Sequence, residues 1–231
     1  MSKLNSVERL NAANIVGHDK QEEAFKNELL DMIRKSRPEG RGGFSMNGLD
    51  HLLVRMKTLY RENHHRGEPS LSELGDALRY VNSKLHSEVQ AGELSAAQRE
   101  THSYIYNYLD KYTFQLAILQ FIREEKPEGS GSFQAARLSH LLNKMRGIYQ
   151  EITDGKSLTL GDLNNNLTYV WATLRKEVMD SVPEADRGEL NDYVKNYLSK
   201  YACQLQNVNL MYTNFMLAMI YKDESLTLEE Y

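Results

Sequence analysis

The chain has 231 residues, of which 41% are hydrophobic, enough to bury one sizeable core or two small ones. Its formal net charge of −4 argues against a nucleic-acid-binding protein, which would need a basic surface. A single cysteine excludes an internal disulfide and a cysteine-rich metal cage, and no apolar run is long enough to predict a membrane span.

The first residues, 1–17, are rich in serine and asparagine and predict a flexible N-terminal arm. They lack the apolar core of a cleavable secretory signal. We therefore expect a cytoplasmic protein, with export by a route that needs no cleaved signal as the alternative. Residues 18–36 carry Phe25, Leu30 and Ile33 on helical spacing and predict the first helix.

The segment RPEGRGGF, which begins at Arg37, recurs as KPEGSGSF from Lys126, 89 positions later. Proline cannot continue a helix and glycine permits chain reversal, so each segment predicts the end of a helix followed by a turn. A phosphate-binding loop is the alternative, but neither segment contains the lysine and hydroxyl ending of such loops. An ungapped alignment of residues 33–116 with residues 122–205 gives 32 identities in 84 positions. This similarity predicts a tandem duplication.

Each repeat reads as three helices. The first follows the glycine-rich turn, with Ser45 as the expected cap and Phe44 packing on Leu49. The second begins at a capping box, Ser70 with Glu73, which recurs as Thr159 with Asp162. The third begins near Ser95 in the first repeat and near Ser181 in the second.

The predicted fold is all-α: a duplicated three-helix repeat of about 89 residues, giving about seven helices. Two pseudo-symmetric bundles would share one long central helix, residues 95–125. The expected organisation is a flexible arm at 1–17, a first bundle at 18–125, a second bundle at 126–222 and an acidic tail at 223–231.

Several polar residues recur on the predicted helices. His51 and His140 fall away from the apolar stripe of the first helix, which favours packing between repeats over a ligand site. A carboxylate near an apolar edge needs a partner, so we expect Glu88 to meet Lys111 or a tyrosine hydroxyl. Glu177 and Lys200 are the second pair. No nucleophile or metal-ligand set accompanies them, so the sequence predicts no catalytic site, cofactor or metal.

The end of the chain departs from the repeat. No third PEG segment occurs there, and Cys203, aligned with Phe114, is expected to be buried. An apolar helix continues instead, and its surface needs a cover, either the rest of the chain or a partner. Its apolar residues are Leu210, Met211, Tyr212, Phe215, Met216, Met219 and Ile220. A basic cluster in the first repeat, comprising Arg34, Lys35, Arg37 and Arg41, is a second surface that could attract an acidic protein or another anionic surface.

These observations favour a non-enzymatic protein–protein interaction protein. A helical adaptor, a secretion-associated factor or an effector, possibly bacterial, would fit, with a protein partner that could be a second copy of the chain. A helical bundle that binds a small molecule is the alternative. An enzyme with an unrecognised site is the third possibility.

Overall fold

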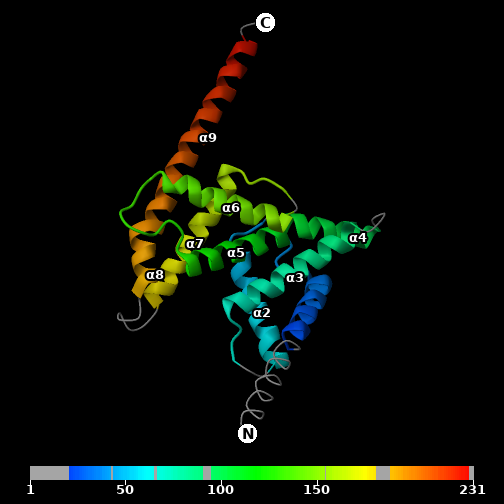
Figure 1. Ribbon diagram of the computed structural model, residues 1–231. Helices are drawn as coiled ribbons and strands as arrows, with labels where there is room; N and C mark the ends of the chain where they lie inside the picture. The colour runs from blue at the N-terminus through cyan, green and yellow to red at the C-terminus, as the bar shows by residue number, and fades with distance from the viewer. Residues whose placement is uncertain are drawn as a thin grey trace. The chain divides into compact units, whose positions relative to one another are not determined.

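The structure is a computed structural model that describes residues 21–42, 44–64, 67–90, 95–153, 155–180 and 188–228 (Figure 1). Within these ranges every regular element is a helix and there is no strand. The expectation of an all-α chain with about seven helices is confirmed. The predicted arm, residues 1–17, and the predicted cap at Ser181 lie outside the described residues.

The described residues form seven helical segments, two of which contain a π-helical turn. In chain order they are residues 21–36, α2 (Gly48–His64), α3 (Leu71–Gln90), α4–η1–α5 (Ala96–Tyr104, Ile105–Leu109, Asp110–Glu125), α6 (Arg137–Thr153), α7 (Leu160–Asp180) and α8–η3–α9 (Gly188–Tyr193, Val194–Leu198, Ser199–Leu228). Helix α9 therefore includes most of the segment 223–231, for which the sequence predicts a tail.

The chain divides into two compact units, Met1–Gln120 and Phe121–Tyr231. Helix α5 begins in the first unit and continues into the second without interruption. This division lies inside the helix that the sequence analysis expects both bundles to share. The two units are described separately below.

The core of the first unit is built from one apolar stripe of each helix. Phe25 of the helix at 21–36 packs edge-on against Tyr60 of α2, with ring centroids 5.1 Å apart. Helix α3 packs against α4 and η1. The completely buried side chains include Leu49 and Met56 of α2, Leu78 of α3, Leu109 of η1 and Tyr112 of α5. Period-3.6 spacing places these residues on the inner faces, as the sequence predicts.

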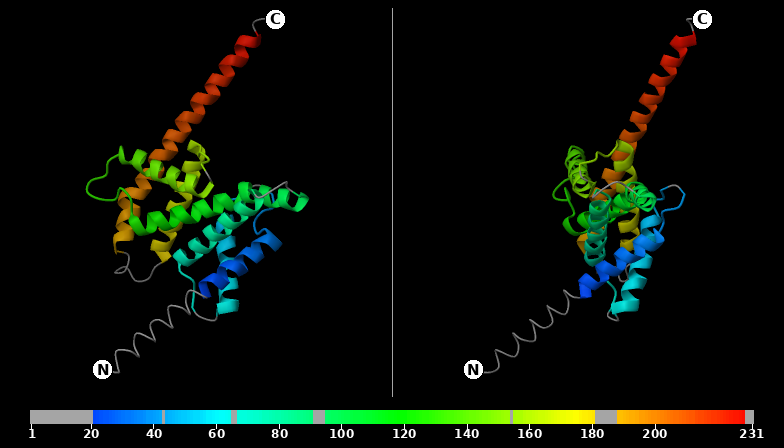
Figure 2. Two further views of the ribbon diagram at one scale, coloured as in Figure 1. Left: turned by 45° about the vertical axis from the view of Figure 1, so that its right-hand side comes forward. Right: turned by 90° about the vertical axis from the view of Figure 1, so that its right-hand side faces the viewer.

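The second unit repeats this arrangement at positions 89 residues later. Helix α7 packs against α8, η3 and α9. The buried side chains include Leu141 and Met145 of α6, Leu167 of α7, Leu198 of η3 and Tyr201 of α9. The start of α9, as far as Leu205, thus belongs to the core, whereas Figure 2 shows the rest of the helix extending beyond α6, α7 and α8.

Reciprocal capping boxes start three of the helices. The Ser70 amide donates to Glu73 at 2.7 Å while the Glu73 amide donates to the Ser70 hydroxyl at 3.2 Å. Thr159 and Asp162 make the same pair of bonds, and so do Ser95 and Gln98. Each box satisfies two backbone donors that the first turn of a helix leaves free. These three predicted starts are confirmed.

Two predicted features of the helices are wrong. Ser45 does not cap α2, because its carbonyl accepts from Gly48 in a separate turn and the helix begins only at Gly48. The long third helix is also not α-helical throughout, because a π-helical turn, Ile105–Leu109, interrupts it. The same turn recurs at Val194–Leu198. A π turn accommodates one extra residue, and its cost is commonly offset by side-chain contacts that the extra residue permits.

Candidate functional site

The PEG segments form a strained turn that ends a helix. Arg37 and Glu39 adopt positive φ angles of 42° and 56° although neither is glycine. The Arg37 amide donates to the Ile33 carbonyl, and the Gly40 amide donates to the Arg37 carbonyl at 3.1 Å. The first bond is a left-handed helix cap, and the second closes a turn with Pro38 at its first central position. The prediction of a helix-ending turn is confirmed. Lys126 and Glu128 adopt the same angles within 4°.

Three tyrosines of the α4–η1–α5 segment hold this turn in place. The hydroxyls of Tyr104 and Tyr112 donate to the carbonyls of Pro38 and Glu39 at 3.0 and 3.1 Å, and Tyr108 donates to Gly42. Burial raises the pKa of Tyr104 and raises that of Tyr112 to about 12, with Glu39 adding to both shifts. The phenols of Tyr104 and Tyr112 therefore stay protonated and act as donors. The same three bonds recur in the second unit, from Tyr193 to Pro127, Tyr201 to Glu128 and Tyr197 to Gly131.

The π-helical turn explains how three tyrosines spaced by four residues reach one short segment. In an α-helix, side chains four residues apart drift around the axis, because one turn takes 3.6 residues. A π turn closes its hydrogen bond one residue later, so a spacing of four there is close to one full turn. The turn at 105–109 lies between Tyr104 and Tyr112 and brings them into line. Tyr104 and Tyr108 accordingly stack, with ring centroids 5.9 Å apart.

Glycine is required where the ring of the first tyrosine crosses the turn. A Cβ at Gly40 would lie 2.5 Å from the Tyr104 ring, and a Cβ at Gly129 would lie 2.5 Å from the Tyr193 ring. No side chain fits at such a distance. The second glycine of each turn, Gly42 or Gly131, instead supplies a positive φ. These glycines are therefore explained by the geometry of the fold.

The expected pairing of Glu88 with Lys111 or a tyrosine hydroxyl is wrong. Arg34 reaches Glu88 from the helix at 21–36, and Arg123 reaches Glu177 at 2.7 Å. Lys111 lies 4.8 Å from the centre of the Phe44 ring, and Lys200 lies 5.1 Å from the centre of the Phe133 ring. The carboxylates are only partly buried, so an arginine at the edge of the bundle can reach them without being desolvated.

His51 and His140 are exposed and lie away from the core. The Nδ1 atom of His51 lies 3.5 Å from Glu39, whose other oxygen lies 3.5 Å from Arg55. In the second unit Lys144 approaches Glu128 at the same distance. These contacts place His51 beside the strained turn of the first unit. No group of three histidine, cysteine or acidic side chains that could hold a metal ion occurs among the described residues.

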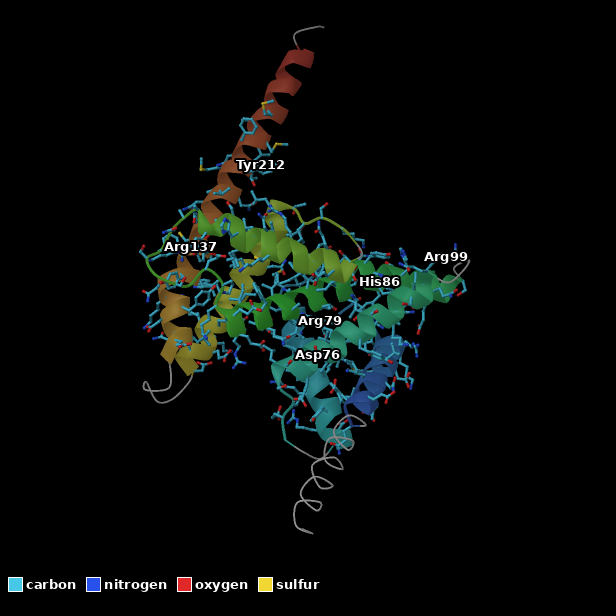
Figure 3. All side chains as sticks on the ribbon, viewed as in Figure 1. Asp76, Arg79, His86, Arg99, Arg137 and Tyr212 are labelled. Carbon is cyan, nitrogen blue, oxygen red and sulfur yellow. The ribbon has the colours of Figure 1, made fainter. Side chains whose placement is uncertain are left out.

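A polar cluster that the sequence analysis did not identify lies against η1 in the first unit. The Nε2 atom of His86 lies 2.7 Å from Oδ1 of Asp110, which is completely buried (Figure 3 labels His86). The Tyr106 ring contacts His86 edge-on and lies 4.2 Å from the ring of His102. Different residues stand 89 positions later in the second unit, so the recurrence of residues in the sequence does not point to these four. The rings of His86, His102 and Tyr106 and the side chain of Asp110 fill this position.

At the same position in the second unit there is a groove. Its volume is about 550 Å³, and it lies between α7, α8, η3 and the start of α9. Its lining residues are Trp171, Arg175, Val178, Met179, Asn191, Val194, Lys195 and Ser199. Four of them stand 89 positions after the residues of the polar cluster: Arg175 for His86, Asn191 for His102, Lys195 for Tyr106 and Ser199 for Asp110. The helical frame recurs, whereas the side chains inside it differ.

The basic cluster of the first unit is partly neutralised. Arg34 pairs with Glu88, and Arg37 pairs with Glu100 at 2.9 Å. Both pairs have counterparts in the second unit, so they belong to the shared framework. Lys35 and Arg41 line a cavity of about 410 Å³ next to Glu100 and Tyr108.

The part of α9 beyond Leu205 carries a continuous exposed apolar surface. Val208, Tyr212, Phe215 and Met219, which we call the α9 stripe, are 44%, 54%, 61% and 48% exposed (Figure 3 labels Tyr212). Leu210, Met211, Met216 and Leu217 are exposed around it. Ile220 belongs to the helix, but its side chain lies outside the described part. None of the described helices has both the length and the apolar character that crossing a membrane requires.

Cys203 is exposed, so the expectation that it fills a core position is wrong. It lies in α9, whose inner face is occupied by Tyr201, Ala202 and Leu205. Phe114, with which it aligns, is buried in α5. The helices correspond in sequence but differ in what covers their outer face.

Comparison of the chain with protein-family models, with curated proteins and with solved structures finds no match.

Proposed function

We propose that the chain is a non-enzymatic protein–protein interaction protein, built from two copies of one helical unit, and that the α9 stripe pairs with the same stripe of a second copy. The duplication is supported by contacts that recur 89 positions apart. They include Tyr104 with Pro38 and Tyr193 with Pro127. The basic cluster is the weaker candidate surface, because two of its four cations already have partners.

The observation that carries the proposal is the spacing along α9. Tyr201, Leu205, Val208, Tyr212, Phe215 and Met219 follow one another at intervals of four, three, four, three and four residues. This is the heptad spacing of helices that pack side by side. The first two are at most 1% exposed, because they pack inside the second unit. The last four continue the same spacing and are exposed.

The charge of α9 favours a second copy as the occupant. No charged residue occurs from Tyr201 to Tyr221, so the stripe offers no charge by which a different partner would be selected. A two-fold symmetric contact places identical surfaces against each other and needs no complementary charge. Aromatic and methionine side chains dominate the stripe, and both are enriched in the centres of protein interfaces.

The test is the molar mass of the full chain in solution, measured by sedimentation equilibrium over a range of protein concentrations. A single chain has a mass of 26.6 kDa, and we expect the wild-type protein to reach at least twice this value. The double variant Tyr212→Ser/Phe215→Ser should return to the mass of one chain. Circular dichroism should show that its helix content is kept, because both residues are exposed.

The matched control is Leu210→Ser/Leu217→Ser, which removes the same kind of surface from the opposite side of α9. This variant should keep the mass of the wild type. A wild-type protein that remains a single chain at its highest soluble concentration would contradict the proposal. Equal dissociation of both double variants would also contradict it.

A further inference from the structure

We propose that the groove of the second unit binds an anionic amphiphile: a long-chain carboxylate whose alkyl chain lies on the groove floor and whose head group meets Arg175 and Lys195. This site is separate from the α9 stripe. The floor is formed by Val178 and Val194, which are 7% and 4% exposed. The indole of Trp171 and the exposed side chain of Met179 form the walls. The volume of about 550 Å³ is within the usual range for small-molecule sites.

The polar groups of the groove select the sign of the ligand charge. Its lining includes two cations, Arg175 and Lys195, and no carboxylate. The Arg175 guanidinium lies 5.3 Å from the centre of the Trp171 ring. A guanidinium held face to face with an aromatic ring keeps its edges free to donate hydrogen bonds to a carboxylate. Asn191 and Ser199 add two uncharged polar side chains to the lining.

Comparison of the two units gives the second argument. At the corresponding position of the first unit, Tyr106 occupies the place of Lys195 and contacts both His86 and His102. Asp110 stands in place of Ser199 and pairs with His86. An anionic ligand would meet a buried carboxylate there. The second unit has the same surrounding helices, but Ser199 stands in place of the acid. Asn191 and Lys195 stand in place of the rings of His102 and Tyr106.

A second hollow extends the same surface. Its volume is about 320 Å³, and it shares Trp171, Arg175 and Met179 with the groove. Lys176 also lines it, and so does one acidic residue, Asp180. An alkyl chain longer than the groove can therefore continue along α7 on an apolar surface.

Trp171 is the only tryptophan of the chain, so its fluorescence reports on this groove. The experiment is a titration of the full chain with decanoate below its critical micelle concentration. We expect a saturable change that fits one site per chain, with unchanged far-ultraviolet circular dichroism. Decyltrimethylammonium, which has the same chain length and the opposite charge, should bind at least tenfold more weakly.

The variant Arg175→Gln/Lys195→Gln should lose roughly tenfold to a hundredfold in decanoate affinity, because hydrogen bonds between charged groups are removed. Met179→Glu should also weaken decanoate binding, because it places a carboxylate beside the head group. The matched control is Lys144→Gln/Arg146→Gln, which removes two cations of α6 in the same unit and should leave the affinity unchanged. All five changed residues are at least partly exposed, so folding should be kept.

No saturable change, equal binding of the cationic amphiphile, or unchanged affinity in Arg175→Gln/Lys195→Gln would each overturn the proposal. The variant Tyr212→Ser/Phe215→Ser should bind decanoate as the wild type does. This last comparison separates the groove from association through α9, because either property can be lost while the other is kept.

Discussion

The hydroxyl of Tyr104 donates a hydrogen bond to the backbone carbonyl of Pro38, 66 residues earlier, at 3.0 Å. Tyr193 makes the same bond to Pro127 at 3.1 Å. Pro38 follows a residue with a positive φ and precedes another, so the carbonyl belongs to a strained backbone segment. These buried hydrogen bonds fix the connection between successive helices.

Removing either hydroxyl should destabilise the protein. We expect Tyr104→Phe and Tyr193→Phe each to lower the free energy of unfolding by about 1–2 kcal/mol, because a buried carbonyl loses its tyrosine donor. Urea denaturation followed by circular dichroism measures the change. The control is Tyr80→Phe, whose hydroxyl makes only an exposed bond to Asn27 at 3.3 Å and should matter by less than about 0.5 kcal/mol. Equal effects at Tyr80 and Tyr104 would contradict the assigned role.

Replacing glycine by alanine should destabilise the protein in the first PEG turn and stabilise it within helix α6. In Gly40→Ala the new Cβ would overlap the Tyr104 ring, and we expect a loss of about 1–3 kcal/mol. In Gly147→Ala, within α6, the new Cβ meets nothing within 4 Å. That substitution should stabilise the protein by about 0.5–1 kcal/mol, because alanine favours the helix. Thermal unfolding of the two variants shows whether each substitution raises or lowers the stability. A stabilised Gly40→Ala variant would refute the close contact between position 40 and the Tyr104 ring.

The buried phenols should make the fold sensitive to alkali. Burial raises the pKa of Tyr112 to about 12, above the value of about 10 in the unfolded chain. The folded protein therefore holds protons that the unfolded chain releases, and stability should be complete below pH 10 and fall as the pH rises toward 12. Tyr104, Tyr193 and Tyr201 shift in the same direction, also chiefly through burial.

Absorbance of phenolate at alkaline pH checks this dependence. The exposed tyrosines should titrate first, and the buried ones should titrate only as the ellipticity is lost. Tyr112→Phe should show a shallower decrease of stability between pH 10 and pH 12 than the wild type. If every tyrosine titrated near pH 10 while the helix content stayed constant, the buried donors would not exist as described.

The sequence predicted those parts of the fold that depend on local signals. Capping boxes such as Ser70 with Glu73 need only four consecutive residues, so they could be read directly. The helical stripes could also be read, since their period is short. The PEG turns could be predicted because proline cannot continue a helix and glycine permits positive φ angles.

Features that depend on tertiary contacts were missed. Arg34 recurs at Arg123, and this recurrence could have identified the partners of Glu88 and Glu177, but a sequence does not show which helix edges meet. The π-helical turns have no composition of their own. The spacing of four between Tyr104, Tyr108 and Tyr112 does not reveal them, because an α-helix also brings residues four apart to one face. The cluster around His86 and the groove around Trp171 could be compared only after both units had been placed in space.

The π-helical turn at 194–198 holds one residue more than the same stretch of α-helix would. Deleting one residue there would therefore restore α-helical geometry and leave the rotational phase of α9 nearly unchanged, so that Phe215 would keep its direction. A deletion in the α-helical part of α9 just after Leu205 would instead turn everything beyond it by about 100°. In this chain the core tolerates a change of length at a point where the exposed helix does not.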